Sequence, residues 1–165
     1  MIEKKLKSNL FIFLLIFAFF MQITFVPQLF ANYAPNFVLI LLLSGSIIDR
    51  SSNIFYISFL TGFILEIFSG ISFGLILVSL ITAVFFVSIL SSIFIKKLYS
   101  YSLLLVCLAG VLIYNVVYIL LLNINSIQSI LNNFNEIFYI TIIQIMFALI
   151  LIYPLTYFIL QKNEK

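Results

Sequence analysis

The sequence contains no histidine, no tryptophan and a single cysteine, Cys107. Without histidine, a Ser-His-Asp catalytic triad cannot form, and a zinc site with several His and Cys ligands is excluded. A single cysteine cannot form an intramolecular disulfide. The sequence also shows no nucleophile beside a base, no glycine-rich phosphate loop and no paired carboxylates. We therefore predict no catalytic residue, no metal site and no cofactor, and we expect that the protein is not an enzyme.

Charged residues are also scarce. They make up 8% of the 165 residues, and hydrophobic residues make up 65%, whereas soluble domains are about a quarter charged and about 45 to 50% apolar. Apolar runs close to the roughly 20 residues that cross a bilayer cover most of the chain. The basic residues lie between these runs and form no blocks, so we expect no nucleic acid partner. The composition predicts an all-α integral membrane protein with a single domain, residues 1–165.

Six apolar runs predict a bundle of six transmembrane helices. The second run is the shortest, because residues 37–48 rise only about 18 Å as a helix. Pro35 and Asn36 lengthen it if they form a first turn, and bilayer thinning or burial among neighbouring helices can accommodate a short span. The approximate helix ranges are 10–30, 35–48, 54–68, 73–95, 101–122 and 137–160.

The basic residues predict the topology, because cytoplasmic loops collect Lys and Arg. If the chain crosses six times from a cytoplasmic N-terminus, all eight cations are cytoplasmic. The three outside segments, near residues 32–36, 69–72 and 123–136, then contain none. Removing one helix would put later cations outside, so the pattern supports the short second span and two cytoplasmic termini. The cations are Lys4, Lys5, Lys7, Arg50, Lys96, Lys97, Lys162 and Lys165.

The third outside segment has a helical pattern of its own. Between Asn123 and Asn135, apolar residues recur at helical spacing among Asn, Ser and Gln. This pattern predicts a short helix that lies on the membrane surface. The alternative is that Ile127, Ile130 and Phe134 bind a periplasmic partner.

Glu66 is an acidic residue towards the outer end of the third predicted helix. An acidic side chain costs about 2.5 to 3.5 kcal/mol at the centre of a transmembrane helix, so something should compensate it. It can reach interfacial water, cap the following turn, pair across helices, contact a partner protein or handle a proton or solute. Gly62 lies one turn earlier on the same face and permits close helix approach. Gly70 belongs to the next turn, and Gly74 continues the four-residue spacing.

Two further polar residues, Asn115 and Gln144, lie inside the fifth and sixth predicted helices. Each belongs to a stripe of small and polar residues at helical spacing, which is typical of helix packing in membranes. The two are candidates for an interhelical hydrogen bond. The stripes contain Cys107, Gly110, Tyr114 and Tyr118 on the fifth helix and Thr141, Gln144 and Ala148 on the sixth.

The central segment, roughly residues 34–80, carries a recognisable pattern. Pro35 begins the second helix, a Gly-x-x-x-acid pattern follows at Gly62 and Glu66, and a Ser-Gly turn at Gly70 precedes a further glycine, Gly74. This pattern resembles the bacterial rod shape-determining protein MreD family, in which aspartate is usual at the position of Glu66. The chain length, six spans and cytoplasmic termini also agree with this family.

The resemblance implies a non-enzymatic, multi-pass scaffold in the bacterial inner membrane, within the cell-elongation machinery that gives rod shape. It implies contacts with an MreC-like protein, the actin-like MreB, a transpeptidase and a glycosyltransferase. The bundle would then couple cytoskeletal filaments to lateral peptidoglycan synthesis. Pro35, Gly62, Glu66, Gly70, Gly74, Asn115 and Gln144 are the candidate partner-contact or packing residues.

The main alternative is the substrate-binding membrane subunit of an energy-coupling-factor vitamin transporter, which is also a small six-helix protein. Such subunits typically carry an Ala-x-x-x-Ala motif on the first helix, whereas here Ala18 is followed four residues later by Gln22. Tryptophan, a common stacking residue for vitamins, is also absent. An unrelated membrane protein, including a lipid-handling enzyme, is a third interpretation.

Overall fold

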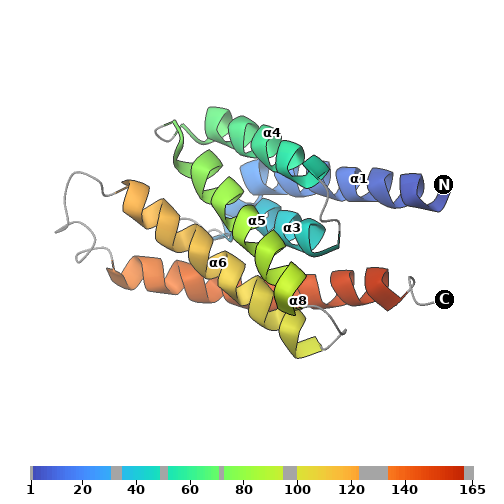
Figure 1. Ribbon diagram of the computed structural model, residues 1–165. Coiled ribbons are helices and arrows are strands. Elements are labelled where there is room, and N and C mark those ends of the chain that lie inside the picture. Colours follow the sequence, from blue (N-terminus) through green and yellow to red (C-terminus); the bar gives the residue numbers. More distant parts are fainter. Residues whose placement is uncertain are drawn as a thin grey trace.

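The computed structural model of the protein describes residues 2–30, 35–48, 52–70, 73–94, 100–122 and 134–161, which form helices and short turns with no strand (Figure 1). Side chains are described for 11–29, 35–47, 53–70, 73–93, 105–122 and 138–151. Each predicted apolar run corresponds to a helix, except that the first is divided in two. The helices are α1 (Ile2–Thr24), α2 (Val26–Phe30), α3 (Phe37–Ile48), α4 (Ser52–Ser69), α5 (Leu75–Phe94), α6 (Ser100–Leu122) and α8 (Phe134–Gln161).

The six long helices alternate in direction along the chain, and the two termini lie at the same end of the molecule (Figure 1). We call the end where α4 leads into α5 the hairpin end, and the opposite end the terminal end. Lys4, Lys5 and Lys7 belong to the first turns of α1 and therefore lie at the terminal end. The other five cations lie outside the described residues, but the helix ends that precede or follow them in the sequence are all at the terminal end (Figure 1).

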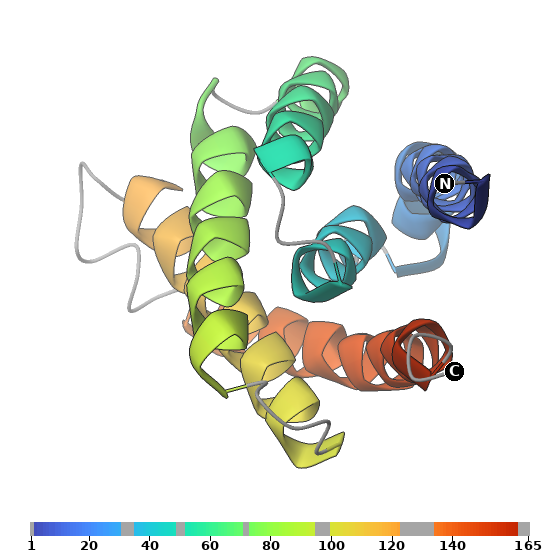
Figure 2. The same ribbon diagram turned by 45° about the vertical axis from the view of Figure 1, so that its right-hand side comes forward.

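Helix α3 occupies the centre of the bundle. Viewed almost along its axis, it is surrounded by α1, α4, α5 and α8 (Figure 2), and it also contacts α6. Every described side chain from Val38 to Ile47 is buried. A helix that is apolar on all sides is either a core helix or a membrane span, and burial shows that α3 lies in the core of the bundle. In a membrane, a helix enclosed in this way could be shorter than the bilayer is thick.

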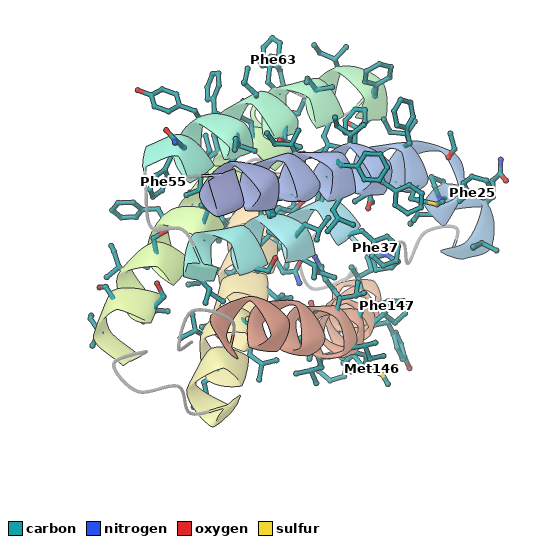
Figure 3. All side chains as sticks on the ribbon, turned by 90° about the vertical axis from the view of Figure 1, so that its right-hand side faces the viewer. Phe25, Phe37, Phe55, Phe63, Met146 and Phe147 are labelled. Atoms are coloured by element: carbon teal, nitrogen blue, oxygen red, sulfur yellow. The ribbon has the colours of Figure 1, made fainter. Side chains whose placement is uncertain are left out.

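Two helix boundaries differ from the prediction. Pro27 lacks an amide hydrogen and its ring crowds the preceding turn, and the chain bends at Phe25, between α1 and α2 (Figure 3). Helix α3 begins at Phe37, so Pro35 and Asn36 do not form its first turn. Instead, Asn36 is the N-cap, because its Oδ1 accepts a hydrogen bond from the backbone N–H of Leu39 at 2.9 Å.

Small residues allow the central helices to approach closely. A Cβ added to Gly110 of α6 would lie 2.5 Å from Val87 Cγ2 of α5 and 3.0 Å from Leu43 Cδ1 of α3. Without a hydrophobic driving force in lipid, helix association depends on such close van der Waals packing. Gly110 therefore marks the position where α3, α5 and α6 meet.

Two described segments are long and apolar enough to cross a membrane, Leu75–Ile93 in α5 and Leu105–Leu122 in α6. Four shorter apolar helical segments accompany them, and the central helix α3 provides one of these. The predicted surface helix between Asn123 and Asn135 falls mainly on residues 123–133, which lie outside the described residues. The four shorter segments are Phe11–Thr24, Phe37–Ile47, Asn53–Ser69 and Phe138–Leu151.

Candidate functional site

Glu66 lies in the last turn of α4, where its side chain is directed into the bundle and is only 2% exposed. Its Oε1 accepts hydrogen bonds from the backbone N–H groups of Ile76 at 2.8 Å and Leu77 at 3.1 Å. These donors belong to the first turn of α5, whose N–H groups have no partner within their own helix. Of the interpretations open for Glu66 from the sequence, this geometry supports capping.

The cap comes from α4 because α5 has no capping side chain of its own. Leu75 is the first residue of α5, so Gly74 occupies the N-cap position, where Ser, Thr, Asp or Asn is usual. Glu66 bonds to the second and third N–H groups, which such a side chain would otherwise satisfy. The carboxyl group also lies at the N-terminal, positive end of the α5 dipole, where acidic side chains are favoured.

Gly70 and Gly74 shape the turn that makes this contact possible. Their φ angles are +65° and +100°, in the region that favours glycine. A Cβ added to either residue would meet nothing within 4 Å. These glycines are therefore required by the backbone conformation and not by lack of space.

Glycine is required at position 62 because the neighbouring helix leaves no space for a side chain. A Cβ at this position would lie 3.2 Å from the Cα of Leu77 in α5. Gly62 and Glu66 thus share the face of α4 that packs against α5, with Leu77 opposite both of them. Both residues are buried within the chain, and a direct contact with a partner protein at these positions stays a prediction.

A second helix start at the hairpin end is capped in the same way. Gln22 of α1 accepts a hydrogen bond at its Oε1 from the backbone N–H of Phe37, at 2.9 Å. Together with Asn36 it satisfies two of the free N–H groups at the start of α3. Pro35, the residue before Asn36, is fully buried. Both α3 and α5 therefore receive a cap from the long helix before them.

A polar side chain also connects α6 to the start of α3. Asn36 Nδ2 donates a hydrogen bond to the Tyr114 hydroxyl at 3.2 Å, and the ring of Tyr114 stacks on that of Tyr118. The structure thus connects the start of α3 to α6 through one tyrosine.

The predicted pair of Asn115 and Gln144 is not the pair that the structure forms. Asn115 Nδ2 donates to Thr141 Oγ1 at 3.2 Å, one turn earlier on α8 than Gln144. Gln144 is 1% exposed, and its Nε2 has no hydrogen-bond partner. It lies between Thr141, which contacts α6, and Phe147, whose ring packs edge-on against Phe37 of α3 (Figure 3). The spacing predicted the correct helices but the wrong residue of α8.

We call Asn36, Glu66, Tyr114, Asn115, Thr141 and Gln144 the polar cluster. Sequence reasoning missed Tyr114 and Thr141 as hydrogen-bond partners in this cluster, and it missed Gln22, outside the cluster, as a cap of α3. The signal for Gln22 was available, because an amide inside an apolar helix requires a partner. Among the described side chains, no three His, Cys, Asp or Glu residues lie together as metal ligands would. These side chains satisfy the starts of α3 and α5, and their hydrogen bonds link α3 to α6, α6 to α8, and α4 to α5.

The model of the family described as rod shape-determining protein MreD matches residues 3–163 of the 165-residue chain. The match extends far beyond the segment at residues 34–80 that carries the sequence resemblance, and it includes the whole polar cluster. Comparison with curated proteins and with solved structures gave no significant match.

Proposed function

Because the chain belongs to the MreD family of rod shape-determining proteins, we propose that it is a scaffold of the cell-elongation machinery in the bacterial inner membrane. The family is a membrane-associated component of shape determination. The match over residues 3–163 is the observation that carries the proposal. In this role the protein holds an MreC-like protein, the actin-like MreB, and the transpeptidase and glycosyltransferase of lateral wall synthesis near one another.

The proposed topology has six spans with both termini in the cytoplasm. The alternating direction of the helices and the shared position of the termini support it (Figure 1). Burial of α3 supports the inclusion of the shortest helix as a span. Every cation then lies on the cytoplasmic side, as the distribution of Lys and Arg in membrane proteins predicts.

A scaffold needs a rigid bundle with an exterior available to other helices. The buried polar groups lie inside and between the helices, whereas the outside of α4 carries exposed rings such as Phe59 and Phe63 (Figure 3). In the proposed arrangement, such outer surfaces contact lipid and the membrane helices of partners. The hairpin end would face periplasmic wall synthesis, and the terminal end would face cytoplasmic filaments.

Depletion of the protein from a rod-shaped host tests the function. We expect the cells to become round while growth continues, and expression of the chain from a plasmid should restore rods. An inactive plasmid copy with an early stop codon is the control. Rod-shaped cells after complete depletion, particularly with lost vitamin uptake, would favour the transporter alternative.

A further inference from the structure

One face of α1 packs on the bundle along most of its length. A Cβ added to Gly45 of α3 would lie 2.5 Å from Phe11 Cζ, so the ring of Phe11 covers this glycine. The same face continues at intervals of three or four residues, which place residues on one side of a helix, and it begins with two lysines. The positions on this face are Lys4, Lys7, Phe11, Leu15, Ala18 and Gln22.

Helix α1 extends further than α3 at the terminal end (Figure 1). It begins at Ile2, so the basic segment belongs to the same continuous helix as the apolar run. Beyond the contact of Phe11 with Gly45, α3 continues for three residues, a rise of about 4.5 Å, whereas α1 continues for nine, a rise of about 13.5 Å. Lys7 therefore lies near the level at which α3 ends, and Lys4 lies beyond it.

In the proposed topology, the two lysines lie at the depth of the lipid headgroups. The apolar run of α1 begins at Leu10, and Lys7 and Lys4 precede it by a rise of about 4.5 Å and about 9 Å. The headgroup region adds about 5 to 8 Å on each side of the hydrocarbon core. Lys7 is therefore placed within this region, and Lys4 is placed at its outer edge.

We propose that this end of α1 binds the headgroup of an anionic phospholipid through Lys4 and Lys7. Positions three residues apart on a helix are neighbours, with about 5 to 6 Å between their Cβ atoms, so two lysines at this spacing can contact one phosphate group. Their depth favours a lipid over an acidic cytoplasmic protein, which would approach from beyond the headgroups. The inference rests on the proposed membrane topology and not on the scaffold role.

Two other charged residues of this segment provide comparisons. Glu3 is four residues from Lys7, a spacing at which helical ion pairs form but are weak, and its negative charge opposes phosphate binding. Lys5 lies on another side of α1, in line with the exposed Ile12, and has no lysine three or four residues away. Removal of Glu3 and removal of Lys5 should therefore have different effects from removal of the proposed pair.

Native mass spectrometry of the purified full-length protein tests lipid binding. Phosphatidylglycerol should bind more tightly than the zwitterionic phosphatidylcholine. Changing Lys4→Gln and Lys7→Gln together should weaken phosphatidylglycerol binding about fivefold for each lysine, the usual contribution of a basic residue beside an anionic membrane surface. Binding of phosphatidylcholine should not change. Equal affinities of the wild type and the double variant for phosphatidylglycerol would overturn the proposal.

The comparison residues supply the matched controls. Lys5→Gln removes the same charge from the same helix and should have a clearly smaller effect than either Lys4→Gln or Lys7→Gln. Glu3→Gln should strengthen phosphatidylglycerol binding. An effect of Lys5→Gln as large as those of the proposed pair would show that only total charge matters, and it would contradict the site. Displacement of the lipid by an oligoglutamate peptide would assign the surface to an acidic protein and would also overturn the proposal.

Hydrogen exchange of the wild-type protein in lipid nanodiscs needs no variant. Amides in the first turns of α1 should exchange up to about fivefold more slowly in phosphatidylglycerol than in phosphatidylcholine. The start of α3, at the hairpin end, is the internal control and should not respond. Equal exchange of the α1 start in the two lipids would contradict the proposal. Because these measurements use the protein alone, their outcome is independent of the cell-shape test of the scaffold role.

Discussion

Single glycine residues contribute to this molecule in two different ways. At Gly62 and Gly110, a Cβ would meet a neighbouring helix, so glycine provides space. At Gly70 and Gly74, a Cβ would meet nothing, but the positive φ angles disfavour other residues. The same change to alanine therefore acts on helix packing at the first pair and on turn conformation at the second.

Gly110→Ala should destabilise the bundle by about 1 to 3 kcal/mol, the usual cost of overpacking. The added methyl would contact Val87 and Leu43, which are fully buried and have little room to move. Thermal unfolding in detergent measures the effect. Leu112→Ala is the matched control, because it changes an exposed side chain on the same helix and should leave the unfolding temperature almost unchanged. Equal unfolding temperatures for wild type and Gly110→Ala would show that the three helices do not meet closely at this point.

Gly70 should tolerate asparagine better than valine, because its φ of +65° lies in the left-handed region. Asparagine visits this region readily, whereas a β-branched residue is an outlier there. We expect Gly70→Val to cost about 1 to 3 kcal/mol and Gly70→Asn clearly less. Unfolding of the two variants under the same conditions compares them, and a smaller loss for valine would contradict the assigned conformation.

The sequence allowed a partial prediction of these residues. The spacing of Gly62 and Glu66 correctly placed both on one face of α4, because helical periodicity determines which residues share a face. It could not identify the acceptor and donor atoms across helices. Which residue of α8 lies opposite Asn115 depends on the position of α8 along α6. A difference of one helical turn separates the observed partner, Thr141, from the predicted partner, Gln144.

At the scale of elements, the two hairpins use the same device. Gln22 of α1 bonds to the start of α3, and Glu66 of α4 bonds to the start of α5. Free N–H groups at a helix start are costly away from water, and α5 has glycine at its N-cap position. A side chain from the preceding helix satisfies the start of the next one and at the same time links the two helices of the hairpin.

Asn36→Ala should destabilise the protein more than Tyr114→Phe. The first change removes the cap of α3, worth about 0.5 to 2 kcal/mol, and also the hydrogen bond to the Tyr114 hydroxyl. The second removes only the hydrogen bond. Thermal unfolding of both single variants and the double variant measures the coupling. If the double variant were less stable by the full sum of the two single effects, Asn36 and Tyr114 would not interact.

The approximate positions of most helices could be predicted, because polar segments separate the long apolar runs and each run corresponds to a helix. The ends of the helices could not, since they depend on capping contacts made by other helices. Helix α3 begins at Phe37 because Asn36 and Gln22 bond to its first turn. The division between α1 and α2 follows from Pro27, a signal that the sequence contained and that the continuous apolar run obscured.

For the whole molecule, the central position of α3 could not be predicted from periodicity. When a helix is apolar on every side, periodicity does not show which face is buried. The same composition is found in helices that face lipid and in helices in a protein core. The structure resolves this ambiguity through burial, because α3 is enclosed by five neighbouring helices. If α3 crosses the membrane as proposed, its length does not have to match the thickness of the bilayer.

Cysteine labelling tests whether α3 crosses the membrane, because each span reverses the side on which the next segment lies. Cys107 is the only cysteine and is buried, so Cys107→Ala provides the background for Ser8→Cys, Ser69→Cys and Ser100→Cys. With three spans before Ser69 and four before Ser100, a membrane-impermeant maleimide applied to spheroplasts should label only Ser69→Cys. A permeant maleimide should label all three. If α3 did not cross, Ser8 and Ser69 would share one side of the membrane and would be labelled, or protected, together.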